Sequence, residues 1–521
     1  MKGTQRRRDE RASSPAETVP PADGGLTDPG AVRNTLLQFA SQIATAAFTS
    51  VLTLYLVRAL GASGYGVYAL AVSVGTLLLL PAGLGLPWAV GRFLADHRAD
   101  IDHARAILIL GLKLQFPAAV LAGAGLFAAS GAIASAYGDP HLAWPLRWVA
   151  MSLIGQALFA FLTSMAQSVR RVAVGLWMVL IESATETSAS VALVLAGGGA
   201  AGAALGKAIG YTVAATIGLF LTLRLLGGQR RRSLAPAPVA LRTLTSYAGA
   251  MFVVDVTWSA IAQVDVLLIG ALLSSAAVGS FSAVLRIMTV LGYLGLAVAG
   301  GIAPRLALGA GSPDTRAFAE AARYLIIVQG LAIAPTVIWA TPIVGLLLGP
   351  GYRSSAEIMQ VLSLAYFVAA PAALFSVAVT YLGEARRRVT IMLGTLVLGL
   401  LATYVLITTA GLVGAAIADD IVAVVYVAAH IWICSRMITL DLRRLAWCGL
   451  RTLIAAGAMM LPMLLAGTSH LSLAGWLGGA SAGGAAYAAV LLLTRELSVA
   501  EVRSVTARLW SGARSTSEAE R

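Results

Sequence analysis

RALGASGYGVYALAVSVGTLLLLPAGLGLPWAVGR, which occupies residues 58–92, consists of a short turn, a long apolar stretch and a closing arginine. A similar segment, ALLSSAAVGSFSAVLRIMTVLGYLGLAVAGGIAPR, occupies residues 271–305. In this alignment Gly66 corresponds to Gly279, and Arg92 corresponds to Arg305. Similarity at a fixed spacing of this size indicates two related bundles of helices, an arrangement that is common among membrane transporters.

The composition predicts a membrane protein. The chain has 521 residues, of which 58% are hydrophobic and only 12% are charged. A soluble protein of this length would carry about twice that charged fraction. Apolar stretches of about 20 residues, long enough to cross a bilayer, recur along nearly the whole chain. They are continuous rather than alternating, which excludes a β-barrel and predicts an all-α polytopic membrane protein.

We expect about 14 transmembrane helices, arranged as two pseudo-repeated six-helix lobes plus two C-terminal helices. Six spans separate the two copies, so both halves enter the membrane in the same direction and form a parallel repeat. In the second span, Pro81, Gly83, Gly85 and Pro87 predict a bend. The predicted divisions are a disordered cytoplasmic tail (1–31), the N-terminal lobe (32–228), a basic cytoplasmic linker (229–243), the C-terminal lobe (244–438), the two additional helices (439–495) and a second cytoplasmic tail (496–521).

The positive charges predict the orientation. The formal net charge is +13, but most arginines lie in short loops and tails on one side of the predicted spans. The positive-inside rule therefore places both termini in the cytoplasm, with the chain crossing the membrane many times. Arg58 and Lys207 are among the few cations assigned to the outer side. This distribution reflects topology, and no nucleic acid is expected as a partner.

Several phrases of the sequence resemble one transporter family. They are LVRALGASGYGVYALAVSVGTLLLL, QVDVLLIGALLSSAAVGSFSAVLRI, LLLGPGYRSSAEIMQVLSLAY, GLVGAAIA and TRELSVAEV. In this order they resemble the polysaccharide and oligosaccharide flippases of the multidrug/oligosaccharidyl-lipid/polysaccharide exporter superfamily, over about residues 32–505. The resemblance implies alternating access and a lipid-linked substrate, an undecaprenyl-pyrophosphate oligosaccharide that moves from the cytoplasmic to the outer leaflet of the bacterial plasma membrane. Membrane lipid and the enzymes of cell-surface polysaccharide synthesis would be the other partners.

A pyrophosphate head group needs cations on its path, and the planar fork of arginine binds phosphate oxygens well. Arg286 lies inside the eighth span, and an intramembrane arginine is a functional-site hypothesis by default. The alternative is a buried ion pair with Asp255 of the seventh span, which lies at a similar depth. Arg92 and Arg305 close the second and eighth spans and Arg33 opens the first. These three are candidate pyrophosphate receivers or simple interfacial anchors.

A second set of charges lies in the first lobe. Lys113 of the third span and Glu182 of the fifth lie at similar depths, so we expect them to pair. Glu186 lies one turn beyond Glu182 on the same face. Two carboxylates so close cannot both ionise cheaply, which suggests either a structural cluster or a site of proton coupling.

Asp265, Asp419 and Asp420 are further candidates for ion coupling. In peptidoglycan-precursor relatives, an aspartate of the seventh span joins polar residues of the eleventh and twelfth spans at a sodium site. Here the eleventh span offers threonines such as Thr395 and Thr403. The resemblance therefore leaves Na⁺ or H⁺ open as the coupling ion, and neither a resident cofactor nor a structural metal is expected.

The sequence contains no GxxxxGK[ST], HExxH or GxSxG motif, so a transporter without catalytic residues is expected rather than an enzyme. Three alternatives stay open. An ion-coupled multidrug exporter of the same superfamily would favour an acidic cavity for cationic drugs. An integral-membrane polysaccharide polymerase or ligase usually has a large outer loop, whereas the longest outer loop here, near residues 131–144, is short. A transport-inactive scaffold for cell-wall enzymes is the third.

Overall fold

The computed structural model describes residues 29–97, 100–227, 241–302, 315–382, 384–469, 471–498 and 500–501. Within these ranges the chain forms helices and connecting turns and contains no strand, so the predicted all-α class is confirmed. The same ranges contain ten segments that are long and apolar enough to cross a membrane. Three of these segments are interrupted at a glycine, at Gly61, Gly197 and Gly411. The expected number of 14 membrane spans stays a prediction.

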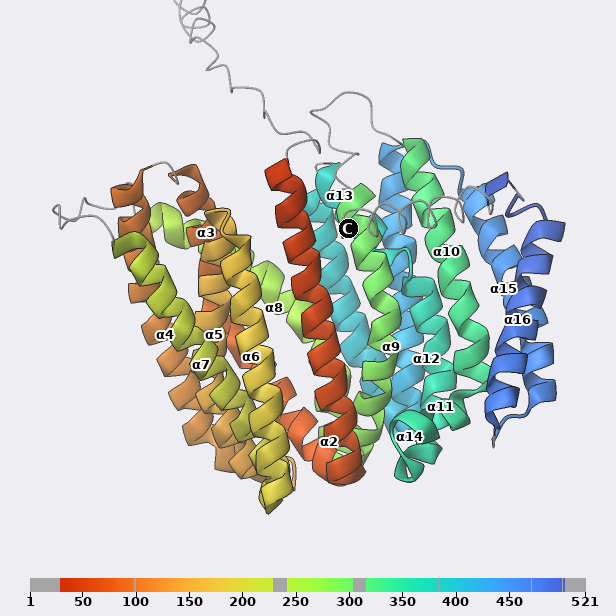
Figure 1. Cartoon of the computed structure of the whole chain (residues 1–521), viewed down its shortest axis with the longest axis horizontal. Helices are drawn as coiled ribbons and strands as arrows, with labels where there is room; N and C mark the ends of the chain where they lie inside the picture. Colours follow the sequence, from red (N-terminus) through yellow and green to blue (C-terminus); the bar gives the residue numbers. More distant parts are fainter. Residues whose placement is uncertain are drawn as a thin grey trace, which may run out of the picture.

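The α-helices follow one another along the whole described chain (Figure 1). They are α2 (Pro29–Gly83), α3 (Leu86–Asp96), α4 (Ile101–Ala136), α5 (Ala143–Ser168), α6 (Val172–Leu193), α7 (Gly199–Gly227), α8 (Leu241–Leu272), α9 (Ser275–Ile302), α10 (Thr315–Ile338), α11 (Ala340–Leu347), α12 (Ala356–Ala369), α13 (Ala372–Tyr381), α14 (Ala385–Met437), α15 (Leu442–Ala466) and α16 (Leu473–Leu493). Short 3₁₀ turns precede α5 and α12, and a π turn, Val194–Gly198, joins α6 to α7.

Helix α2 lies between two groups of helices (Figure 1). On one side α4, α5, α6 and α7 pack against one another, and on the other side α9, α10, α12, α13 and α14 do so. Helices α15 and α16 pack together at the edge of the second group, where α15 contacts α10. The predicted division into two six-helix lobes and two further helices, with boundaries at 228 and 438, stays a prediction.

The glycine at the centre of α2 allows the chain to reverse. Gly61 has φ 65° and ψ −180°, a conformation that is essentially restricted to glycine. Residues on either side of Gly61 therefore form two arms of α2, residues 29–60 and 62–83. The predicted bend of the second span is also confirmed, because α2 ends at Gly83, Leu84 and Gly85 have positive φ, and α3 begins at Leu86.

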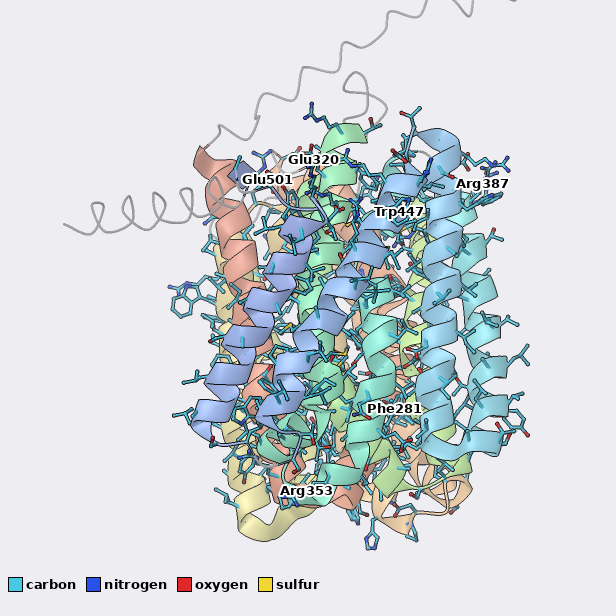
Figure 2. All side chains as sticks on the ribbon, turned by 90° about the vertical axis from the view of Figure 1, so that its right-hand side faces the viewer. Phe281, Glu320, Arg353, Arg387, Trp447 and Glu501 are labelled. Carbon is cyan, nitrogen blue, oxygen red and sulfur yellow. The ribbon has the colours of Figure 1, made fainter. Side chains whose placement is uncertain are left out.

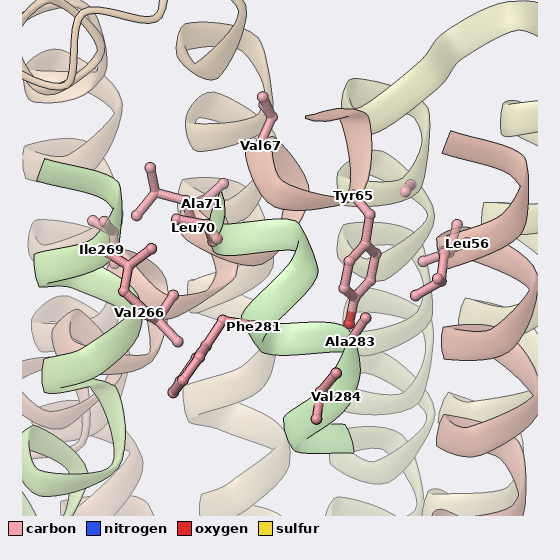
Figure 3. Close-up of a cluster of buried hydrophobic side chains, with 14 of the residues drawn as sticks. Leu56, Tyr65, Val67, Leu70, Ala71, Val266, Ile269, Phe281, Ala283 and Val284 are labelled. Atoms are coloured by element: carbon pink, nitrogen blue, oxygen red, sulfur yellow. The ribbon is translucent and has the colours of Figure 1, made fainter. Parts of the chain in front are cut away.

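The two copies of the repeated segment pack against each other. The second arm of α2 crosses α9 where Gly66 meets Gly279, and a buried apolar cluster surrounds the crossing. Figure 3 shows Leu70 and Ala71 of α2 beside Val266 and Ile269 of α8. Burial of these side chains joins α2, α8 and α9 at the end of the molecule opposite the start of α2 (Figure 1).

Three predicted boundaries shift. Helix α2 begins at Pro29 inside the predicted tail, and α8 begins at Leu241 inside the predicted linker 229–243. The predicted tail 496–521 begins with a packed residue, because Glu496 is buried. Helix ends are set by local turns and tertiary contacts that hydropathy does not register, which explains shifts of a few residues.

Candidate functional site

A polar cavity of about 350 Å³ lies between α2, α6, α7, α8 and α9. Both arms of α2 contribute to its wall, so the cavity lies where the two groups of helices face each other. Hydroxyl groups are frequent in this wall, and four charged side chains accompany them. The polar lining residues are Thr45, Thr49, Thr53, Tyr65, Tyr68, Ser73, Thr76, Glu182, Ser183, Glu186, Thr187, Lys207, Tyr211, Gln263, Ser282, Arg286 and Thr289.

One wall of the cavity carries an ion pair between α6 and α7. The Nζ of Lys207 lies 3.3 Å from Oε1 of Glu186, and both side chains are nearly buried. The Lys207 ammonium also lies 4.8 Å from the ring centre of Tyr211, one turn further along α7. Glu182 is buried one turn from Glu186 and accepts a hydrogen bond of 2.9 Å from Ser183 Oγ. This wall therefore holds two carboxylates but one ammonium group.

The structure corrects the predicted pairing of Lys113 with Glu182. Lys113 is exposed on α4 and does not line the cavity, whereas Lys207, which had been assigned to the outer side, lies inside α7 and pairs with Glu186. The reason is the tight turn at Gly197, from which Glu186 and Lys207 lie about equally far along α6 and α7. Residues equidistant from such a turn face each other in antiparallel helices, and this spacing was the missed signal.

Arg286 lies on the opposite side of the cavity, on α9, beside the hydroxyl of Tyr65. Figure 3 shows the Tyr65 ring extending from α2 toward this part of α9. Arg286 also lines a second, mostly apolar cavity of about 330 Å³, bordered by Ile287, Ile343 and Met359. Arg286 therefore lies at the boundary between the polar cavity and the mostly apolar cavity.

The other predicted cations lie elsewhere or outside the described residues. Arg92 is exposed on α3, and its guanidinium carbon lies 4.8 Å from the ring centre of Tyr247 on α8. Arg305 lies outside the described residues. Arg33 lies in the first turns of α2, and its side chain is outside the described part of the structure. Arg92 does not line the polar cavity.

Asp255 is placed differently from the alternative that paired it with Arg286. Its Oδ2 accepts a hydrogen bond of 3.0 Å from Nε1 of Trp88, which joins α8 to α3. Asp255 does not line either cavity to which Arg286 contributes. The carboxylate thus serves the contact between two helices on its own side of the molecule.

A second acidic cluster joins α8 and α14. Thr403 Oγ1 donates a hydrogen bond of 2.8 Å to Oδ1 of Asp265, and the carboxyl group of Asp419 lies beside that of Asp265. The neighbouring Asp420 is engaged separately, because its Oδ1 accepts a bond of 2.7 Å from the backbone N–H of Ala365. Two neighbouring carboxyl groups repel each other when both are ionised, so this cluster is a candidate for binding a proton or a small cation.

The sequence and the fold were compared with known proteins. The family model described as polysaccharide biosynthesis protein matches residues 31–307. The chain belongs to this family. No match to a curated protein sequence was found.

Solved structures share the fold of this polysaccharide biosynthesis family member. One is titled lipid II flippase MurJ in an inward closed conformation, with a TM-score of 0.70, 12% identity, and coverage of 89% of this chain and 99% of that chain. An inward-facing multidrug resistance MATE family transporter of the MOP superfamily aligns with a TM-score of 0.58 and 16% identity, covering 74% of this chain and 95% of that chain. An outward-facing MATE family transporter aligns with a TM-score of 0.52 and 14% identity, covering 78% of this chain and 95% of that chain.

In this family member the cavity combines features that suit an amphiphilic anion. Arg286 supplies a positive charge apart from the Lys207–Glu186 pair, and the threonine, serine and tyrosine hydroxyls supply neutral donors and acceptors. The adjoining cavity is mostly apolar, although threonine and serine side chains also line it, and Arg286 is the charged residue that the two cavities share. A ligand with a charged group between a polar part and a hydrocarbon part could place the polar part in the first cavity and the hydrocarbon part in the second.

Proposed function

We propose that the protein is a flippase that moves an undecaprenyl-pyrophosphate-linked oligosaccharide from the cytoplasmic to the outer leaflet by alternating access, for cell-surface polysaccharide synthesis. One observation carries this proposal: Arg286 borders both a hydroxyl-lined cavity and an apolar one. In such a substrate the pyrophosphate joins the sugar to the lipid. The arginine would hold the pyrophosphate, while the sugar occupies the hydroxyl-lined cavity.

The energetic need for such a cavity follows from the substrate. A charged and hydroxylated head group cannot enter hydrocarbon without losing its hydration, whereas its lipid tail can remain in the bilayer throughout. A hydroxyl-lined chamber containing cations replaces that hydration with fixed protein groups. Family membership in polysaccharide biosynthesis supports the choice of a sugar-bearing lipid.

We further propose that both termini are cytoplasmic and that the bilayer is the bacterial plasma membrane. The crossing of Gly66 and Gly279 then closes the outer end of the pathway. Two more contacts reinforce this closure: Arg58 Nε donates to the carbonyl of Leu347 at 3.0 Å, and the Tyr352 hydroxyl donates to the carbonyl of Val57 at 3.3 Å. Release of the sugar to the outside would require these contacts to separate.

The acidic cluster of Asp265, Asp419 and Thr403 is the proposed site of ion coupling. Binding or release of Na⁺ or H⁺ there would change the charge between α8 and α14, and thus the relative stability of the two access states. The cavity wall with Glu182 and Glu186 is a second candidate for proton coupling. The Lys207 ammonium group balances one of these two negative charges.

Multidrug export is the alternative within the same fold, and polymerase or ligase activity is an alternative of another class. In the cavity Lys207 is paired with Glu186, whereas Arg286 lies on another helix and borders the apolar cavity as well, so we place the anionic group of the substrate at Arg286 and prefer a lipid-linked anion to a cationic drug. We keep an integral-membrane polymerase or ligase as a second alternative.

Reconstitution in liposomes tests the proposal. Fluorescent undecaprenyl-pyrophosphate sugar placed in both leaflets should become fully accessible to a membrane-impermeant quencher only in vesicles that contain the protein. A neutral lipid with the same chain and fluorophore should be flipped much more slowly. Equal rates for both lipids, or transport of a cationic dye in place of the lipid, would refute the flippase assignment.

A further inference from the structure

A basic pocket of about 360 Å³ lies far from the central cavity, where α10 and α15 begin and α16 ends. Figure 2 shows Trp447 and Glu501 at this end of the molecule, opposite Arg353. Five arginines, two carboxylates and one indole form its wall. They are Arg323, Arg443, Arg444, Arg451, Arg495, Asp441, Glu496 and Trp447. Arg443 and Arg444 are among the arginines whose placement on one side of the predicted spans indicates orientation.

The floor of this pocket is a rigid network around one carboxylate. Arg323 Nε lies 2.9 Å from Oε1 of Glu496, and Arg451 Nη1 lies 2.9 Å from Oε2 of the same group. Arg323 also binds Glu501, at 3.1 Å. Arg323 and Glu496 are almost fully buried. These bonds fix the segment after α16 against α10 and α15, and they hold Arg495 at the rim.

The rim carries an excess of positive charge. Arg443, Arg444 and Arg495 are exposed, and within the described ranges none of them forms an ion pair. The Asp441 carboxylate is engaged as the cap of α15, since it accepts a bond of 2.9 Å from the backbone N–H of Arg444. Arg495 has a φ of 55°. Glycine usually occupies this position after a helix, so the arginine is held there against its backbone preference.

An apolar stripe descends from the pocket along α15. Trp447, Leu450, Ile454, Leu461 and Leu465 recur at helical spacing, and each is exposed, from 47% for Leu450 to 90% for Leu465. Tryptophan favours the level of lipid head groups, and the residues below it extend toward the bilayer core. A soluble anion would contact the arginines alone, whereas a phospholipid would contact both the arginines and the stripe.

We propose that this pocket binds the phosphate head group of an anionic phospholipid, with one acyl chain along the stripe of α15. Basic pockets between transmembrane helices at the cytoplasmic side are known to bind such head groups. The bound lipid would join α15, α16 and α10 at a site separate from the substrate cavity. The proposal does not depend on what the central cavity transports.

Native mass spectrometry of the detergent-purified full chain tests this site by titration with phosphatidylglycerol and with phosphatidylcholine. The test variant is R443Q/R444Q/R495Q. The control is R386Q/R387Q, which removes two exposed arginines outside the pocket, one of them paired with Glu384. Figure 2 shows Arg387 at the same end of the molecule. We expect one phosphatidylglycerol to bind the wild type more tightly than phosphatidylcholine. Its affinity should fall about fivefold per arginine removed in the test variant and stay unchanged in the control.

Three results would overturn the proposal. Equal affinity for the two phospholipids would show that no anionic head group is selected, and equal losses in the test and control variants would show diffuse attraction at this end. A third arm adds inorganic phosphate at the same concentration as the lipid. Complete displacement of phosphatidylglycerol by phosphate would mean that the site serves a free anion. Both variants change exposed residues, so their melting temperatures should match the wild type and verify folding.

Discussion

Gly66 and Gly279, which occupy equivalent positions in the two halves of the sequence, pack directly against each other. A Cβ atom built on Gly66 would overlap the carbonyl oxygen of Ser275, and one built on Gly279 would overlap that of Ala62. The backbones of α2 and α9 approach this closely only because both residues lack a side chain. The repeat thus provides both sides of the contact that closes one end of the molecule.

Replacement of either glycine by alanine should weaken this closure. We expect Gly66→Ala or Gly279→Ala to destabilise the present arrangement by about 1–3 kcal/mol, the usual effect of overpacking, and to slow lipid flipping. Melting in detergent and the liposome assay measure the two effects. Gly394→Ala on α14 is the control, since no atom lies within 4 Å of its new Cβ, and it should behave like the wild type. Wild-type behaviour of both test variants would contradict the contact.

The role of Arg286 can be separated from that of a general cation. Arg286→Ala should reduce the flipping rate at least about tenfold, because a hydrogen-bonded charge for the pyrophosphate is lost. Arg286→Lys should retain part of the rate, since it keeps the charge but not the fork. Arg92→Ala should have little effect, because Arg92 stacks on Tyr247 outside the cavity. A fully active Arg286→Ala variant would remove this residue from the mechanism.

The ion pair in the cavity wall predicts a difference between two lysines. Lys207→Met should leave Glu186 without its buried partner and destabilise the protein by about 3–5 kcal/mol. Lys113→Met should be neutral, because Lys113 is exposed. The double variant Lys207→Met/Glu186→Gln should recover much of the lost stability. Denaturation in detergent provides the comparison, and equal effects of the two lysine variants would count against the observed pairing.

The segment after α16 predicts a dependence on pH. The pKa of Glu501 is lowered to about 2 by the backbone N–H of Ser498 and by Arg323. The pKa of Glu496 is also lowered, because the bonds from Arg451 and Arg323 outweigh the effect of burial. A lowered folded-state pKa stabilises the protein above the ordinary glutamate pKa, and this stabilisation is lost as the pH falls through the folded-state value. The melting temperature of Glu501→Gln should therefore lie below that of the wild type at pH 7, and the gap should close between about pH 4.5 and pH 2.

The acidic cluster predicts a loss of ion dependence. Asp265→Asn and Asp419→Asn should each remove the shared proton or cation between α8 and α14, so flipping should no longer respond to a gradient of Na⁺ or H⁺. Flux measured with each gradient imposed separately would identify the ion. Asp420→Asn is the matched comparison, because its carboxylate binds the backbone of Ala365 instead. An unchanged gradient response in both test variants would exclude the cluster from coupling.

Local features and conspicuous charges could be predicted from the sequence, whereas contacts between side chains of different helices could not. It indicated the bend at Gly85 because proline and glycine act on the local backbone. It singled out Arg286 because a charge inside an apolar stretch is conspicuous in any arrangement. It did not indicate that Asp255 would bind Trp88, since helices that are apolar on every side carry no periodic signal of their rotation.

Hydropathy and the repeat alone determined that this protein is a helical membrane protein with two related halves. The transfer free energy and the length of each segment depend only on the order of residues along the chain. Only the tertiary structure decided that Lys207 pairs with Glu186, in place of the expected pair of Lys113 and Glu182. It also decided that Arg495 lies in one pocket with Arg443 and Arg444. Those outcomes depend on where turns fall and how each helix is rotated against its neighbours. The rotation is set by the packing of small residues such as Gly66 and Gly279, so it appears only when the helices are assembled.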